Sequence, residues 1–459
     1  MQRTLFLSAL ILLITFIDAD AQRRATTYES LLQRTDQPSS YIDHIVIPES
    51  DSTARMAVFF RLDYDFIPFL RKQPDMPAPT PTSEYYAPVR MGLEVFQGPP
   101  PSSRRSSASA TSVFRDSWQD TVWVETFDDT KSRFDYTQGF VATTLDKGAY
   151  HYELQLSRAG SVREQSSTRR PVSIPDYTQF ESAAFYLLRD FNLDNNRFSG
   201  TLLNYSNSVL YGQDYSLLVM LPKEADSLTL NIHLLGSGSN AEPGDIRYSA
   251  ELTDENTVFF NGADFESSNG NIQLNAPISD DGIRYAVIQV PNQEFENSRF
   301  RIRLMQEGKD EPLAERTISS QWLDMPVSLY NLDVAINMMR FIVSDTELRR
   351  LNSGSASERE EKFRQFWAER DPSPDTEFNE LMAEYYSRID HAFRNFSSLQ
   401  TPGYETDQGR AYILYGAPDN IERRLPANAP TREIWEYPGR TLIFEATTGF
   451  GDFRLVSES

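Results

Sequence analysis

The sequence predicts a multidomain fold: two all-β, immunoglobulin-like sandwich domains followed by an α+β domain with helices packed on a small antiparallel sheet. Two observations support this prediction. Within residues 46–325, apolar and polar residues alternate in many short segments, which is typical of strands with one buried face. After about residue 330, apolar residues recur at helical spacing instead.

Residues 46–165 are expected to form the first sandwich, after a polar stretch at residues 22–45 that is typical of a flexible arm. The clearest strand is Tyr150–Ser157, where apolar and polar residues alternate strictly. Two stretches rich in proline or serine, residues 74–81 and 99–112, interrupt the strand pattern and are expected to be loops.

Residues 176–325 are expected to form the second sandwich, after a linker at residues 165–175. Turn clusters separate short apolar segments here, as they do in sandwich folds. The candidate strands are Leu217–Leu221, Leu228–Leu234, Thr257–Phe260, Ile272–Leu274, Tyr285–Val290 and Phe300–Met305. The chain has no cysteine, so no Cys…Trp…Cys framework supports the immunoglobulin-like prediction, which depends on strand pattern alone.

The α+β domain is expected at residues 330–459, where helical periodicity begins. Two serine–glutamate pairs with capping-box spacing mark helix starts, Ser344–Glu347 and Ser357–Glu360. Thr376 is expected to cap the longest helix, whose broad apolar face extends over Phe378–Phe396.

Four strands are expected to form the sheet of this domain: Ala411–Tyr415, Glu433–Tyr437, Thr441–Glu445 and Phe453–Val456. A Pro438-Gly439 turn joins the middle pair. Because the helices need a surface on which to bury their apolar faces, we expect them to pack on this sheet.

The first 21 residues have the three-part pattern of a secretory signal peptide. Arg3 supplies the positive charge, Leu5–Ile17 is apolar, and Ala19-Asp20-Ala21 is a small-x-small cleavage site. The apolar run is shorter than the roughly 20 residues that cross a bilayer as a helix, and no cysteine follows that could carry a lipid. The mature chain is therefore expected to be soluble and exported, to the periplasm or outside the cell.

Charge and composition narrow the possible partners. The formal net charge of −22 disfavours nucleic acid and anionic membrane surfaces, both of which attract Lys and Arg. The acidity is expected to keep the protein in solution. No later apolar run is long enough to span a membrane, so no transmembrane segment is expected after signal cleavage.

Blocks near the end of the chain resemble, in order and spacing, the GWxTD domain, which is found in exported proteins of Gram-negative bacteria. The blocks are Phe366–Pro374, Asn379–Glu380, Tyr385–Arg388, Gly403–Arg410, Tyr412–Asp419 and Ile434–Tyr437. The Gly-Trp-x-Thr-Asp motif that names the family reads Gly-Tyr-Glu-Thr-Asp here, with Tyr404 in the tryptophan position. The resemblance implies export and a β-rich region ahead of this domain, but no established reaction, ligand or catalytic residue.

The motif is interpreted as a structural corner. Gly403 permits a turn, Tyr404 places a ring against a core, and Thr406 and Asp407 can accept backbone N–H groups. Asp407 and Arg410 are close enough in sequence to pair across the turn. The motif residues taken as structural are Trp367, Asp371, Pro372, Glu380, Gly403, Tyr404, Thr406, Asp407, Arg410, Gly416, Pro418, Asp419 and Trp435.

No catalytic, cofactor-binding or metal-binding residue is assigned from the sequence. The four histidines occur in no nucleophile or zinc context, and no glycine-rich phosphate loop follows a strand. A hydrolase remains an alternative, using a pair among five carboxylates near element ends. These carboxylates are Asp371, Glu380, Asp407, Asp419 and Glu436.

The leading hypothesis is a noncatalytic envelope protein whose β-sandwiches present the C-terminal domain to a protein partner, another envelope protein. A second alternative is a glycan- or peptide-binding protein that uses exposed aromatic side chains, for which the candidates are Trp118, Trp123 and Trp322. The oligomeric state does not follow from the sequence.

Overall fold

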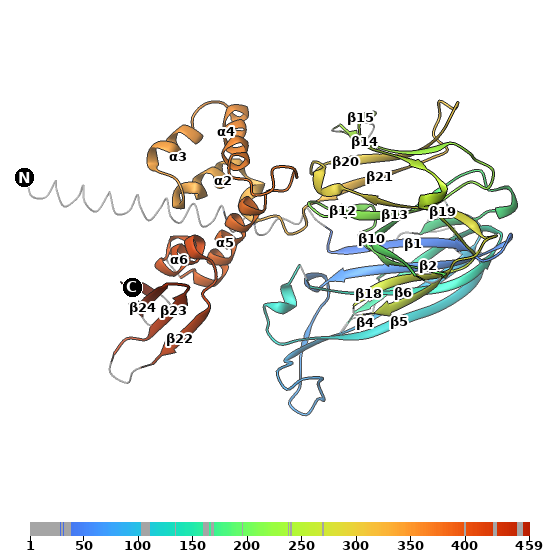
Figure 1. The fold of residues 1–459 in the computed structure, drawn as a ribbon. Coiled ribbons are helices and arrows are strands. Elements are labelled where there is room, and N and C mark those ends of the chain that lie inside the picture. Colours follow the sequence, from blue (N-terminus) through green and yellow to red (C-terminus); the bar gives the residue numbers. More distant parts are fainter. Residues whose placement is uncertain are drawn as a thin grey trace, which may run out of the picture. The chain divides into compact units, whose positions relative to one another are not determined.

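The structure is a computed structural model (Figure 1). It describes residues 28, 31, 38–101, 111–133, 135–158, 165–166, 169–194, 196–236, 238, 241–268, 270–398, 401–425, 429–447 and 453–459. The chain divides into a β unit, residues 37–323, and a C-terminal unit, residues 324–459, whose core also holds Tyr28 and Leu31. The expected signal peptide at residues 1–21 lies outside the described residues. Throughout the described ranges, no helix is long and apolar enough to cross a membrane.

The first half of the β unit builds two antiparallel sheets. Sheet 1 has the order β1-β2-β6, and in sheet 2 the strands β3-β4-β7-β8 are joined by β5 beside β4 and β9 beside β7. The strands are β1 (Ser40–Pro48), β2 (Thr53–Asp63), β3 (Leu70–Arg71), β4 (Tyr85–Gln97), β5 (Ser112–Val124), β6 (Tyr136–Asp146), β7 (Gly148–Arg158), β8 (Gln165–Ser166) and β9 (Arg170–Ile174).

The second half builds sheet 3, of order β16-β19-β13-β10-β11-β18-β17, and sheet 4, of order β12-β21-β20-β14-β15. The β12–β21 pair is parallel and the other pairs are antiparallel. The strands are β10 (Ala184–Asp194), β11 (Arg197–Leu202), β12 (Ser208–Leu210), β13 (Tyr215–Met220), β14 (Leu228–Leu235), β15 (Pro243–Leu252), β16 (Thr257–Phe260), β17 (Asp264–Ser268), β18 (Asn271–Pro277), β19 (Ile283–Val290), β20 (Arg299–Gln306) and β21 (Ala314–Gln321).

Single-turn 3₁₀ helices connect several of these strands. They are η1 (Tyr64–Phe66), η3 (Asp129–Lys131), η4 (Tyr177–Gln179), η5 (Asp254–Asn256) and η6 (Asn292–Glu294).

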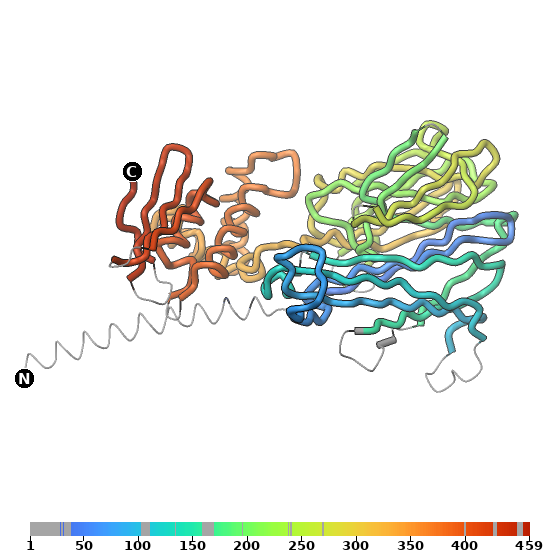
Figure 2. The backbone as a smooth tube through the Cα atoms, turned by 90° about the horizontal axis from the view of Figure 1, so that it is seen from below, coloured from blue at the N-terminus to red at the C-terminus, as the bar shows by residue number. Residues whose placement is uncertain are grey.

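Sheet 1 lies between sheets 2 and 3, so β2 is buried along nearly its whole length. On one face the Phe60 ring lies 5.0 Å from that of Trp118 in β5. On the other face Arg61 Nη1 donates to Tyr205 Oη at 2.7 Å, beside sheet 3. Figure 1 shows β2 between β13 of sheet 3 and β4 of sheet 2, and Figure 2 shows the blue-to-cyan and green-to-yellow halves of the unit on opposite sides.

The predicted sandwiches are therefore stacked, with sheet 1 of the first against sheet 3 of the second. One hydrophobic cluster runs from sheet 2 through sheet 1 to the near face of sheet 3, and a second fills the space between sheets 3 and 4. The predicted β-sandwich fold followed by an α+β domain is confirmed.

Two stretches differ from the sequence-based expectation. The expected linker at residues 165–175 contains β8 and β9, because Val172 and Ile174 are buried in the first cluster while β9 pairs with β7. The expected flexible arm at residues 22–45 contains the start of β1. Its residues Tyr28 and Leu31 are also buried, in the core of the C-terminal unit.

The C-terminal unit contains five α-helices, three 3₁₀ turns and a four-stranded antiparallel sheet, sheet 5, in its described residues. They are η7 (Val327–Tyr330), α2 (Leu332–Met338), η8 (Met339–Phe341), α3 (Asp345–Leu351), α4 (Ala356–Ala368), α5 (Glu380–Phe396), η9 (Gly403–Glu405), α6 (Asp407–Tyr415), β22 (Asn420–Arg424), β23 (Arg432–Tyr437), β24 (Arg440–Ala446) and β25 (Phe453–Glu458). Most helices bury their apolar faces against one another, and sheet 5 packs on α6 and the end of α5.

Local corrections concern helix boundaries and one element type. The α5 cap is Asn379 rather than Thr376, since the Asn379 side chain accepts from Met382 N. The capping box at α4 is Ser355–Glu358 rather than Ser357–Glu360. The expected strand Ala411–Tyr415 is the second half of helix α6, because Thr406 caps that helix and Gly416, at φ +80°, ends it.

Candidate functional site

The motif residues form a buried corner where the chain passes from η9 into α6. Gly403 and Gly409 have no room for a side chain there. A β-carbon on Gly403 would lie 1.9 Å from the Ala392 carbonyl oxygen, and one on Gly409 would lie 1.7 Å from the Gly403 carbonyl oxygen. Both glycines are therefore required by close backbone approach.

Thr406 and Asp407 attach the start of α6 to its surroundings. Thr406 Oγ1 accepts from Gly409 N at 3.0 Å, as an N-cap does, and donates to the Gly403 carbonyl at 2.7 Å. Asp407 Oδ2 accepts from Leu455 N of β25 at 2.9 Å. Asp407 is therefore bonded to sheet 5, in place of the expected pairing with Arg410, which is exposed on α6.

Tyr404 is a core residue with no exposed surface. Its ring centroid lies 5.6 Å from that of Tyr28 and 5.8 Å from that of Phe393. The Arg340 guanidinium lies 5.6 Å from the same ring and pairs with Glu405 at 2.9 Å. The tyrosine in the tryptophan position of the motif thus fills an aromatic cluster.

Asp390 on α5 is a buried carboxylate that the sequence analysis missed. Its Oδ1 accepts the Tyr28 hydroxyl, and its Oδ2 accepts from Val327 N at 2.8 Å. Burial raises the pKa of Asp390 and also that of Tyr28. The available signal was an acidic residue between Ile389 and Ala392, on the apolar face of a long helix.

Trp435 joins sheet 5 to the start of α6 through a shared carboxylate. Glu433 Oε2 accepts from Gln408 Nε2 at 2.7 Å and from Trp435 Nε1 at 3.3 Å. Trp435 is itself buried against Phe396 and Phe444. Glu433 thus provides the buried polar atoms of Gln408 and Trp435 with an acceptor.

The other motif residues lie at element ends. Trp367 is buried on α4 against the rings of Tyr385 and Tyr386. Gly416 has positive φ and a β-carbon there would lie 3.1 Å from the Arg388 guanidinium. Pro372 and Pro418 lie in the connections after α4 and after α6.

The five carboxylates considered for hydrolysis lie on several elements, and of these only Asp419 and Glu436 are neighbours, across the β22–β23 pair. Asp371 accepts from Ser373 N after α4, and Glu380 is in the first turn of α5. Asp407 contacts β25, at one edge of sheet 5, whereas Asp419 precedes β22, at the opposite edge, and its backbone N–H donates to the Glu436 carbonyl. Within the described ranges, no group of three or more His, Asp or Glu could hold a metal ion.

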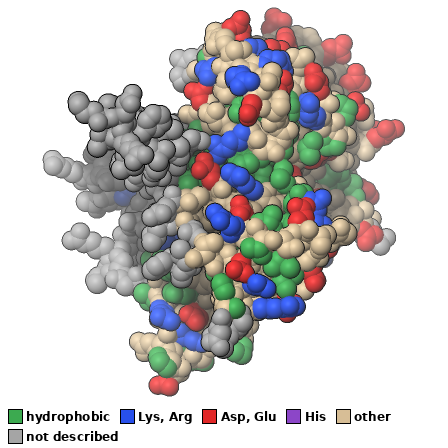
Figure 3. Space-filling view, turned by 90° about the vertical axis from the view of Figure 1, so that its left-hand side faces the viewer, with side chains coloured by type: hydrophobic (Ala, Val, Ile, Leu, Met, Phe, Trp, Pro, Cys, Tyr) green, Lys and Arg blue, Asp and Glu red, His purple; other side chains and the backbone are tan. Residues whose placement is uncertain are grey.

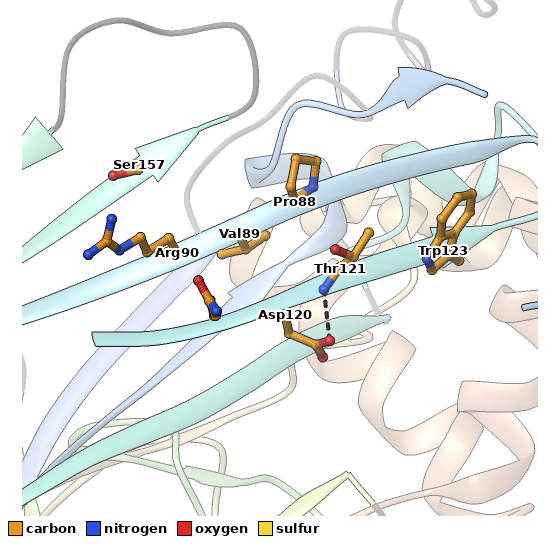
Figure 4. Close-up of a pocket in the computed structure, with 8 residues that line it drawn as sticks. Pro88, Val89, Arg90, Asp120, Thr121, Trp123 and Ser157 are labelled. Atoms are coloured by element: carbon orange, nitrogen blue, oxygen red, sulfur yellow. Dashed lines mark hydrogen bonds between the residues drawn. The ribbon is translucent and has the colours of Figure 1, made fainter. Parts of the chain in front are cut away.

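A shallow pocket of about 630 Å³ lies on sheet 2 (Figure 4). Its lining residues are Pro88, Val89, Arg90, Gln119, Asp120, Thr121, Trp123 and Ser157. Trp123 lies at one end, with its ring 5.3 Å from that of Tyr86. Of the three candidate tryptophans Trp123 alone lines this pocket, since Trp118 packs on Phe60 and Trp322 is buried beside Tyr211.

The C-terminal unit is an α+β domain in which the motif residues form a buried corner and bond helix α6 to sheet 5. Residues 326–450 match the family model of the GWxTD domain, so this part of the chain is a GWxTD domain, as the sequence blocks predict. No curated protein matches the chain.

Proposed function

We propose that the chain is an exported, noncatalytic envelope protein whose β unit supports the GWxTD domain for binding to another envelope protein. The observation that carries this proposal is the edge strand β22. It is one of the two edge strands of sheet 5, and all five of its residues are exposed. Exposed strand edges offer unpaired backbone groups with which a partner strand can pair.

Apolar side chains accompany this edge. Ile421 is 52% exposed and Leu425, just after β22, is 76% exposed. Ile421 stands opposite the buried Trp435 in the register of β22 and β23, so it extends the apolar row of the sheet to the rim. A partner segment paired with β22 would cover Ile421, adding buried apolar area to the backbone hydrogen bonds.

Charge contributes little to the choice of partner on the face drawn in Figure 3. Basic and acidic side chains are intermixed there with apolar ones, although the chain is acidic as a whole. On this face no single sign of charge dominates, so a partner meets no uniformly charged patch there. This supports recognition through backbone pairing and apolar contact. The location of the protein, in the periplasm or outside the cell, is proposed from the signal-like N-terminal pattern and is tested by cell fractionation.

Site-specific crosslinking in cells tests the binding proposal. A photo-crosslinking amino acid at Ile421 is expected to capture a discrete protein, whereas the same residue at Leu193, which is 46% exposed on β10, is not. With the crosslinker kept at position 421, Leu425→Lys should abolish that capture by placing a charge beside the edge. Equal capture from both positions, or none from position 421, would refute the role of β22.

A second candidate function is glycan binding at the pocket on sheet 2. Trp123 offers a partly exposed ring, and the hydroxyl, amide and guanidinium groups of Thr121, Gln119 and Arg90 line the same hollow. Trp123→Ala should remove binding on a glycan array, whereas Phe127→Ala, which deletes an exposed ring outside the pocket, should keep it. An array with no binding by the unaltered protein would eliminate this candidate.

A further inference from the structure

The core of the GWxTD domain contains two side chains from the N-terminal segment. Tyr28 is 1% exposed and Leu31 is 8% exposed, and both belong to the hydrophobic cluster of the helices. The Tyr28 ring lies 4.5 Å from that of Phe393 and 5.6 Å from that of Tyr404. The domain thus includes a tyrosine that lies 362 positions before its hydrogen-bond partner Asp390.

The domain itself holds in place the carboxylate that accepts the Tyr28 hydroxyl. Asp390 Oδ2 is held by Val327 N at 2.8 Å, which leaves Oδ1 to accept the Tyr28 hydroxyl. A buried acceptor that loses its donor keeps its desolvation cost, so a phenylalanine in place of Tyr28 would be disfavoured. The surrounding rings select an aromatic residue, and Asp390 selects one with a hydroxyl.

We propose that the GWxTD domain carries a peptide-binding groove for a tyrosine followed three residues later by a leucine, and that Tyr28 and Leu31 of the same chain are its resident ligand. The groove is lined by Asp390, Phe393 and Tyr404, so the tyrosine of the GWxTD motif forms part of its wall. This site is separate from the β22 edge and does not depend on the function proposed there.

Occupancy by the same chain follows from the covalent connection. A tethered ligand competes at an effective concentration on the order of millimolar, which a free peptide of similar affinity must exceed. Cutting the tether removes that advantage. The N-terminal segment then becomes an ordinary ligand that a second peptide can replace.

The test uses the mature full-length chain with a site-specific protease sequence inserted between Asp36 and Gln37, the boundary between the two units. After cleavage of the folded protein, the N-terminal fragment is expected to co-elute with the remainder on size exclusion. A synthetic peptide of residues 22–36 should then displace it. The Tyr28→Phe and Leu31→Ala versions of that peptide should each need at least about tenfold higher concentration, since each loses one of the two anchors.

Three results would overturn the proposal. The first is release of the fragment at the moment of cleavage while circular dichroism shows the remainder folded. The second is equal displacement by the native and Tyr28→Phe peptides. The third is a dimer of the uncleaved protein that the peptide dissociates, because the groove would then hold the segment of a second copy. An inserted protease sequence without cleavage is the matched control for folding.

Discussion

The carboxylate of Asp407 accepts a hydrogen bond from the backbone N–H of Leu455, and this contact joins the first residue of α6 to the edge strand β25. It lies next to the point where the register of β24 and β25 shifts, between Ile443 and Phe444. Asp407, a residue of the motif, thus binds a strand residue that lies 48 positions further along the chain.

Removing this acceptor should weaken the C-terminal unit. Asp407→Ala is expected to lower the free energy of unfolding by about 1–3 kcal/mol, because a hydrogen bond to a charged group is lost and Leu455 N loses its acceptor. Asp407→Asn keeps an acceptor oxygen and should cost less. Urea unfolding measures both, and Arg410→Ala, an exposed change on the same helix, serves as the control. Equal losses in all three variants would contradict the role of the hydrogen bond.

Gly403→Ala should be more severe than any polar change at the corner. The added methyl group would lie 1.9 Å from the Ala392 carbonyl oxygen, a backbone atom that cannot move aside cheaply. We expect a loss of about 3 kcal/mol or more in the free energy of unfolding, at the upper end for overpacked sites. Gly92→Ala is the matched control, because its nearest neighbour would be 3.7 Å away. A thermal unfolding midpoint for Gly403→Ala near that of the native chain would contradict the steric reading.

Thr406 should contribute as an N-cap. Thr406→Ala is expected to lower the free energy of unfolding by about 1 kcal/mol, since Gly409 N loses its side-chain acceptor. Thr406→Ser retains the hydroxyl and should restore most of the loss. Denaturant unfolding of the three proteins checks the order, and an alanine variant as stable as the serine variant would show that the cap contributes nothing.

The stability of the β unit should depend on pH through Asp63. Burial, partly offset by the neighbouring Arg61 guanidinium, raises the pKa of Asp63 to about 6 from an ordinary value near 4. The folded chain then binds more protons than the unfolded chain between these values, so this group's contribution falls as pH rises from about 4 to 6. Asp63→Asn should flatten the slope, measured as the difference in unfolding free energy from the native chain. Asp264→Asn, at an exposed carboxylate, should leave it unchanged.

The sequence-based prediction was correct for those elements in which the periodic apolar residues are also the residues buried in the structure. The alternation in Tyr150–Ser157 lies inside β7, and the long apolar face near residues 378–396 became α5. The pattern failed for α6, where Ala411 and Ile413 alternate with less buried residues as they do in a strand. In that segment the N-cap at Thr406 and the close approach of Gly409 to the Gly403 carbonyl favour a helix over a strand.

Two features of the candidate sites had no pattern to reveal them. Strand β22 is exposed at every residue, so it has no buried face to produce alternation. The docking of Tyr28 depends on Asp390, far along the chain, and a single sequence does not show such a long-range pair. The role of Thr406 was accessible because its partners, Gly403 and Gly409, are close in sequence. In contrast, Gly403 meets Ala392 and Tyr404 meets Tyr28, which are more distant along the chain.

The burial of β2 on both faces has a consequence for synthesis. Ribosomes release this strand well before residues 184–290, which supply all the strands of sheet 3. Until those residues arrive, one apolar side of sheet 1 has nothing to cover it, even if sheet 2 has already formed. The nascent chain therefore passes through a stage in which it is prone to aggregation, and a chaperone that holds the first 180 or so residues would raise the yield of folded protein.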